Sequence, residues 1–126
     1  MSILNGNNKL IVDKSFFGKI NCFKVQMNRE KEVYFHIGIK KGEAWNWIKV
    51  KMSDMEMGEI IHTISKDEGK CSFFHSFKEN KTQIWCNKSS SGFSIKIKDI
   101  SKNLSIGETE VLRIILNGCI QRRNFN

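Results

Sequence analysis

Proline is absent from the 126 residues, arginine supplies only four of the 21 basic side chains, and apolar runs are short. Without proline, the chain contains neither proline-rich linkers nor polyproline II ligands. No apolar stretch approaches the roughly 18 residues that a membrane-spanning helix needs. The opening sequence MSILNGNNKL lacks the charged and apolar regions of a secretory signal peptide. We therefore expect an intracellular protein, cytoplasmic or nucleoid-associated.

Closely spaced metal ligands and catalytic motifs are also missing. The four cysteines form no CxxC pair, and the three histidines lie far apart along the chain. Structural zinc sites need clustered ligands, so we expect no metal, and we expect no cofactor. In an intracellular protein we expect the thiols to be reduced. The chain has no GxSxG, P-loop or GxGxxG motif. We accordingly expect a non-catalytic protein, and an enzyme site assembled only in three dimensions is the weaker alternative.

What the chain does have is length for one domain, 40% apolar residues and a net charge of +8. Most of its cations are lysines, point charges that suit phosphates better than base edges. A lysine-rich composition is equally typical of an AT-rich genome. The acids concentrate in residues 53–68, which carry five acidic side chains against one lysine. A basic body with one acidic segment is typical of a polyanion binder with a distinct rear face.

Hydrophobic periodicity predicts two similar units within one domain spanning residues 1–126, with a frayed terminus at residues 1–8. The first unit, residues 9–68, has strand candidates at Lys19–Met27, Val33–Lys40 and Trp45–Met52, and a possible extra strand at Lys9–Val12. The second unit, residues 69–123, has candidates at Lys70–Lys78, Thr82–Lys88 and Phe93–Ile100. The predicted fold is therefore α+β, with antiparallel strands and a helix in the order βββα, twice.

Each unit ends in a helix that begins at a capping box. Ser53 with Glu56 opens the first helix, and Ser105 with Glu108 opens the second. Gly118 inside the second helix suggests close packing at that position. A shift of 47 residues superposes the segment IKVK on IKIK, which favours a pseudo-repeat.

The alternation of side chains along each strand separates an apolar face from a polar one. All three tryptophans and the single tyrosine fall on the polar face, interleaved with lysines. The candidate nucleic-acid-binding residues are Tyr34, His36, Lys40, Trp45, Trp47, Lys49, Lys51, Trp85, Lys96 and Lys98. A surface that stacks unpaired bases and neutralises phosphates needs both residue types. Because duplex DNA hides the flat faces of its bases, exposed aromatic side chains favour single strands.

Two other interpretations stay open at this point. Both faces of the sheet could be covered, in which case the tryptophans would pack against a helix or a dimer partner. Alternatively, the aromatic face could dock another protein, making the chain a protein–protein interaction module. The segment Lys70–Lys78 is aromatic on both faces, and we assign Phe73, Phe74 and Phe77 to packing.

The segments VYFHIGIKKGEAWNWIKVKM and TQIWCNKSSSGFSIKIKDI, each with its following helix, carry a resemblance that extends from Lys19 to Arg123. Their architecture and surface chemistry resemble those of single-stranded nucleic-acid binders of the Whirly and Pur type, including ThermoDBP-like archaeal proteins. Those families place four strands before each helix, whereas three are predicted in the second unit here.

The resemblance implies binding of single-stranded DNA or RNA, with little sequence preference, across a sheet surface. By resemblance, Tyr34, Trp45, Trp47 and Trp85 would stack bases, and the five lysines of the candidate set would contact phosphates. It also implies a homo-oligomer, most simply a dimer joined through the second helix. The helix residues Ile115, Leu116, Cys119 and Ile120 would form that seam or would pack into the chain's own core.

Overall fold

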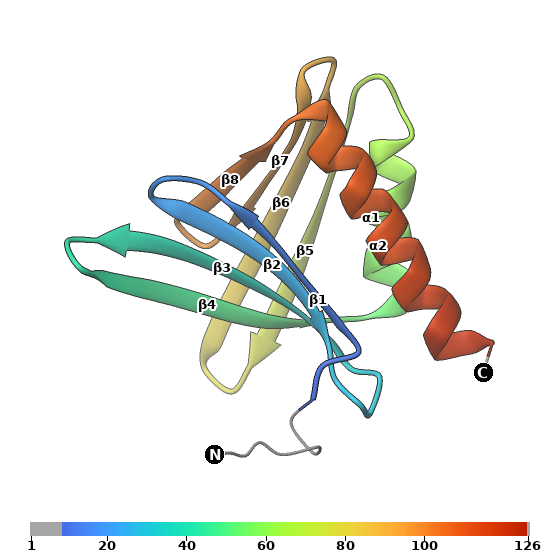
Figure 1. The fold of residues 1–126 in the computed structure, drawn as a ribbon, viewed down its shortest axis with the longest axis horizontal. Coiled ribbons are helices and arrows are strands. Elements are labelled where there is room, and N and C mark those ends of the chain that lie inside the picture. The colour runs from blue at the N-terminus through green and yellow to red at the C-terminus, as the bar shows by residue number, and fades with distance from the viewer. Residues whose placement is uncertain (1–8, 126) are drawn as a thin grey trace.

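Two four-stranded antiparallel sheets and two helices make up residues 9–125, the part of the chain that the computed structural model describes (Figure 1). The predicted fraying of residues 1–8 lies outside this part. The first sheet, sheet A, contains β1 (Val12–Phe17), β2 (Asn21–Met27), β3 (Val33–Lys41) and β4 (Ala44–Met52), and α1 (Asp54–Ile64) follows it. The second, sheet B, contains β5 (Gly69–Phe77), β6 (Asn80–Ser89), β7 (Gly92–Ile97) and β8 (Ile100–Leu104), and α2 (Ile106–Asn124) follows it.

Both helices begin at the predicted capping boxes. The backbone N–H of Glu56 donates to the Ser53 hydroxyl at 3.2 Å, and the Glu56 carboxylate accepts from the Ser53 N–H at 3.0 Å. Ser105 and Glu108 form the same pair of bonds at 3.2 and 2.9 Å. These bonds satisfy backbone donors that the first helical turn leaves without partners.

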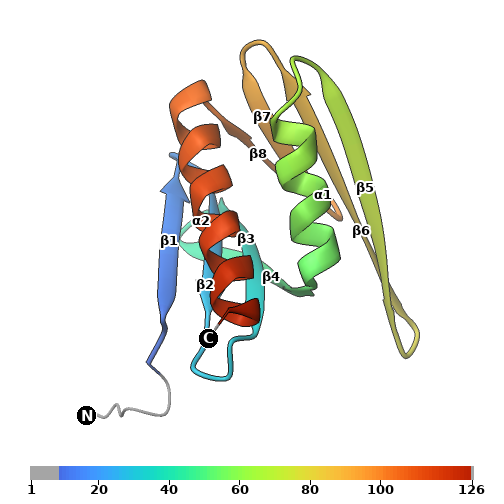
Figure 2. The same ribbon diagram turned by 90° about the vertical axis from the view of Figure 1, so that its right-hand side faces the viewer.

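The inner faces of the two sheets and the inward sides of both helices share one hydrophobic core. The helices lie side by side, as Figure 2 shows. The predicted inward side chains are buried there, among them Phe35, Ile37, Ile84 and Ile95. Leu116 and Cys119 are also fully buried in this core. Of the two roles considered for them, the chain's own packing is therefore the one the structure supports. The exposed apolar residues of α2 are Ile106, Val111 and Ile114.

Four strands precede each helix, so the predicted order βββα is wrong for the second unit, while the possible extra strand of the first unit is present. The predicted strand Phe93–Ile100 is interrupted at Lys98, which has a φ of 56°, and the chain turns there into β8. The extra N-terminal strand exists, but it spans Val12–Phe17 rather than Lys9–Val12. The reason is the same for β1 and β8, because each places a lysine on its inner face and so breaks the apolar alternation.

The pseudo-repeat has a different register from the one the sequence suggested. The 47-residue shift superposes β3 on β6 and β4 on β7, which hold different positions in their sheets. Elements in equivalent positions are β2 with β6 and β3 with β7, and the two helix caps lie at Ser53 and Ser105. The match of IKVK to IKIK therefore reflects two similar hairpins.

The expected close packing at Gly118 is also not observed. A Cβ built at that position meets no atom within 4 Å. Gly118 consequently leaves an open place on the helix rather than a contact.

Candidate nucleic-acid interface

The pairing of β3 with β4 brings seven of the ten candidate residues onto one surface. In this antiparallel register Tyr34 lies opposite Lys51, His36 opposite Lys49, and Lys40 opposite Trp45. Trp47 completes the set, opposite Gly38. We call this the β3–β4 surface; it consists of Tyr34, His36, Lys40, Trp45, Trp47, Lys49 and Lys51. Its residues alternate with the buried inner set along both strands, as the sequence predicts.

The two tryptophans of this surface form a stacked pair supported by a glycine. The rings of Trp45 and Trp47 have centroids 5.6 Å apart and planes inclined by 19°. A Cβ at position 38 would lie 2.6 Å from Cε3 of Trp47, so the absence of a side chain there allows the indole to rest against the backbone of β3. Trp47 is still 42% exposed. The pair therefore leaves part of its aromatic area exposed to solvent on this surface.

Lysine ammonium groups lie over the aromatic rings of this surface. Nζ of Lys49 is 4.3 Å from the ring centroid of Tyr34, and Nζ of Lys24 is 4.5 Å from that of Trp47. Lys24 comes from β2, opposite His36, and was not among the candidate residues. The alternation along β2 could have predicted the outward position of Lys24, because its neighbours Phe23 and Val25 are both buried inner residues. Cation–π contacts of this kind hold positive charge beside a stacking platform.

His36 lies among these cations. Burial is the main cause that lowers the pKa of His36, and the charges of Lys49 and Lys24 lower it further. Asp13 acts weakly in the opposite direction. His36 is therefore held in its neutral form at pH 7, although its position among lysines makes it sensitive to an approaching anion.

Lys51 has a partner within the protein. Its Nζ donates to the Glu32 carboxylate at 2.8 Å, and Glu32 also accepts from the Asn28 side chain. The hydrogen bond to Lys51 is the main cause that lowers the pKa of Glu32. A phosphate contact from Lys51 would have to compete with this exposed ion pair.

Trp85 and Lys96 lie on sheet B, apart from the other candidates. They are opposite one another on β6 and β7, with Nζ of Lys96 5.4 Å from the Trp85 ring centroid. The ten candidates therefore occupy two sheets, and the single sheet face expected from the sequence is wrong. Lys98 belongs to neither surface pattern, since it lies in the turn between β7 and β8.

Phe74 adds an aromatic side chain beside Trp85. It is 59% exposed and projects to the same side of sheet B, with Gln83 opposite it. The assignment of Phe74 to packing is therefore wrong, whereas Phe73 is partly buried against the core. We call Phe74, Trp85 and Lys96 the β6–β7 surface. The sequence could not predict that Phe74 lies on the same side as Trp85, because β5 has aromatic side chains on both faces.

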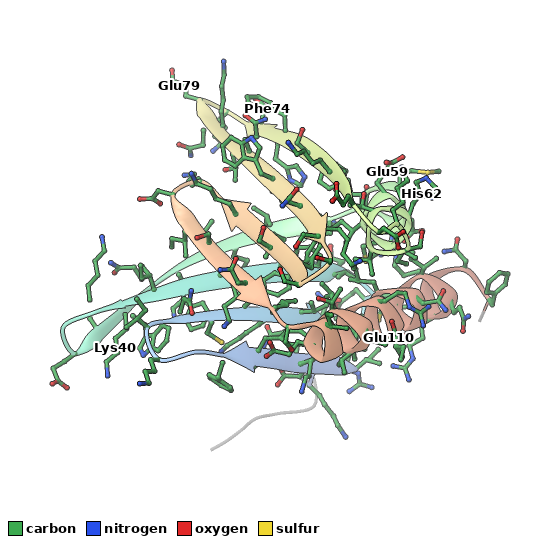
Figure 3. The ribbon with its side chains drawn as sticks, turned by 90° about the horizontal axis from the view of Figure 1, so that it is seen from above. Lys40, Glu59, His62, Phe74, Glu79 and Glu110 are labelled. Carbon is green, nitrogen blue, oxygen red and sulfur yellow. The ribbon has the colours of Figure 1, made fainter. Side chains whose placement is uncertain are left out.

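Three acids of the acidic segment, Asp54, Glu56 and Glu59, lie on α1, away from the tip of the β3–β4 hairpin. Figure 3 shows Lys40 near that tip and Glu59 and His62 on the helix, toward the opposite end of the molecule. Asp54 at the start of α1 pairs with Arg123 of α2 at 2.5 Å. The acids of α1 therefore lie away from the tip of the aromatic hairpin.

Among residues 9–125, no group of three or more His, Cys, Asp or Glu side chains is placed to hold a metal ion. No helix in the same range is long and apolar enough to cross a membrane.

The fold is similar to that of a solved protein described as the plant transcriptional regulator PBF-2, a Whirly protein. The TM-score is 0.69 over 90% of this chain and 82% of that chain, at 15% sequence identity. Neither protein-family comparison nor a search of curated proteins finds a match. The Whirly-type architecture implied by the sequence is therefore confirmed at the level of the fold.

Proposed function

We propose that this protein binds single-stranded DNA or RNA, without catalysis and with little sequence preference, at the β3–β4 surface. The observation that carries the proposal is the stacked Trp45–Trp47 pair, with Lys24 over the Trp47 ring and Lys49 over the neighbouring Tyr34 ring. Bases stack on exposed aromatic faces whatever their identity, and each stacked base contributes about 1–3 kcal/mol. The similarity to a transcriptional regulator supports the same class of ligand.

In this proposal the aromatic side chains and the cations have separate roles. Trp47, Trp45 and Tyr34 receive bases, and Lys24, Lys40 and Lys49 neutralise phosphates. Lys51 contributes less, because its ion pair with Glu32 must be broken first. The β6–β7 surface, with one tryptophan and one phenylalanine, acts as a second and weaker contact for a longer strand.

The test is a fluorescence-anisotropy titration of labelled oligo-dT with the wild-type chain, Lys49→Ala and the matched control Lys66→Ala, at several salt concentrations. Lys66 is exposed and belongs to the segment after α1. Its replacement by alanine removes one positive charge, as Lys49→Ala does. We expect Lys49→Ala to weaken binding and to reduce the slope of log affinity against log salt by roughly 0.7, the value for one phosphate contact on a single strand.

Equal effects of the two lysine variants would contradict the proposal, since binding would then depend only on net charge. Absence of binding to oligo-dT and to oligo-U at low salt would favour the alternative, a protein-docking surface. An apolar protein contact would be nearly insensitive to salt.

A further inference from the structure

Two of the four cysteines, far apart in sequence, lie directly opposite one another in sheet B. Cys71 on the edge strand β5 pairs with Cys86 on β6 in the antiparallel register. Opposed residues in such a pair have Cα atoms about 4.5–5.5 Å apart, and a disulfide accommodates about 4.4–6.8 Å. Both side chains project to the inner face of the sheet. The register therefore brings the two Cα atoms within the range that a disulfide spans.

The two thiols already interact. A side-chain hydrogen bond with Cys86 is the main cause that lowers the pKa of Cys71 to about 7, and a hydrogen bond with Thr63 assists. Burial and the charge of Glu59 on α1 oppose this shift. The same hydrogen bond raises the pKa of Cys86, so Cys86 acts as the proton donor of the pair. A thiolate at Cys71 is the nucleophilic form in disulfide exchange.

Cys71 is also within reach of a small molecule. It is half-buried, whereas Cys86 is 2% exposed. The other two thiols, Cys22 and Cys119, are fully buried, and burial raises the pKa of each. They serve as internal references.

We propose that Cys71 and Cys86 form a reversible intramolecular disulfide by exchange with a low-molecular-weight disulfide such as oxidised glutathione. The Cys71 thiolate attacks one sulfur of the oxidant, whose S–S bond breaks and releases one thiolate. Cys86 then loses its proton to solvent and attacks the Cys71 sulfur of the mixed disulfide, releasing the second thiolate. The pair gives up two electrons and two protons, and the oxidant becomes two thiols.

The bridge does not depend on nucleic-acid binding. It would tie the edge strand β5 to β6 and close a short loop in the unfolded chain, so the oxidised protein should melt at a higher temperature than the reduced one.

The experiment incubates the full folded chain with oxidised glutathione, blocks remaining thiols with N-ethylmaleimide, and maps the modified peptides by mass spectrometry. We expect a bridge between Cys71 and Cys86, two alkylated thiols at Cys22 and Cys119 after unfolding, and full reversal by dithiothreitol. Cys86→Ala should instead accumulate one glutathionyl group on Cys71, and Cys71→Ser should acquire none. Thermal melts establish that each variant is folded.

Four alkylated thiols in the treated wild-type chain would overturn the proposal. A bridge that maps to Cys22 or Cys119, or one that joins two chains, would overturn it as well. The decisive measurement uses the wild-type protein, so the proposal can be overturned even if a variant fails to fold.

Discussion

Gly38 is the residue that allows an indole to lie against the sheet. The Trp47 ring occupies the space that a Cβ at position 38 would need. Such a Cβ would lie 2.6 Å from Cε3 of Trp47, which is closer than real Cβ contacts. Trp47 then stacks on Trp45 and receives Lys24 near its ring. The geometry of the proposed stacking platform therefore depends on Gly38, a residue outside the set proposed to contact nucleic acid.

Gly38→Ala should displace the Trp47 ring and weaken binding of oligo-dT by an amount comparable to one lost stacked base, about 1–3 kcal/mol. Gly118→Ala is the control, because a Cβ there meets open space. That control should leave affinity unchanged and stabilise α2 by about 1 kcal/mol. Anisotropy titrations and thermal melts of both variants provide the two readouts. Unaltered affinity in Gly38→Ala would show that the position of Trp47 is irrelevant to binding.

If the proposed interface binds nucleic acid, His36 should make that affinity sensitive to pH. The pKa of His36 is lowered from its ordinary value near 6.5, so the imidazole is neutral at any pH above that value. The charged groups around it are Lys49, Lys24 and Asp13. As pH falls from there, the unfolded chain takes up this proton first, so folding stability decreases. A bound phosphate raises the pKa and favours the protonated form. Affinity for oligo-dT should therefore rise a few-fold as pH falls from 7.5 toward 5.5, and His36→Gln should lose most of that rise.

At the scale of elements, six of the eight strands and both helices could be predicted, and the outer strands β1 and β8 could not. Strands β3, β4 and β6 follow strict alternation, and the capping boxes locate the first residue of each helix. β1 and β8 place Lys14 and Lys102 on their inner faces, next to Val25 and Ile95. Inward-pointing charges on edge strands discourage pairing with another chain, and the same feature hides such strands from a pattern search.

Glu56 has two tasks, and Glu108 has one. Both close capping boxes, but the second carboxylate oxygen of Glu56 also lies 2.6 Å from Nε2 of His75 on β5. Glu56→Ala should therefore destabilise the fold by about 1 kcal/mol more than Glu108→Ala, which removes only the cap. Chemical denaturation of the two variants measures the difference. Equal losses would mean that the link from α1 to sheet B contributes nothing to stability.

At the scale of the whole molecule, strand alternation predicted the β3–β4 surface residue by residue. It could not predict how the hairpins are distributed, because alternation specifies the face of a strand and not the sheet to which it belongs. Trp85 and Lys96 were therefore assigned to the same surface as Trp47. Pairing across sheets depends on long-range contacts in the shared core, which involve residues from both sheets and both helices.

The two surfaces should contribute unequally to binding. The β3–β4 surface combines the stacked tryptophans with Tyr34 and three lysines, whereas the β6–β7 surface has Trp85, Phe74 and Lys96. We expect Trp47→Ala to weaken binding of a short oligo-dT by at least tenfold, while Trp85→Ala affects chiefly longer strands. Titrations with oligonucleotides of increasing length separate these effects. A larger loss for Trp85→Ala on the short strand would place the main site on sheet B.

The most direct test of single-strand binding is intrinsic tryptophan fluorescence during titration with oligo-dT, at low salt and again at high salt. Trp47 and Trp85 are both 42% exposed, so stacked bases should quench the emission. The account predicts saturable quenching that weakens strongly as salt increases, since counterion release accompanies phosphate contacts. An emission spectrum that oligo-dT leaves unchanged at low salt would contradict it.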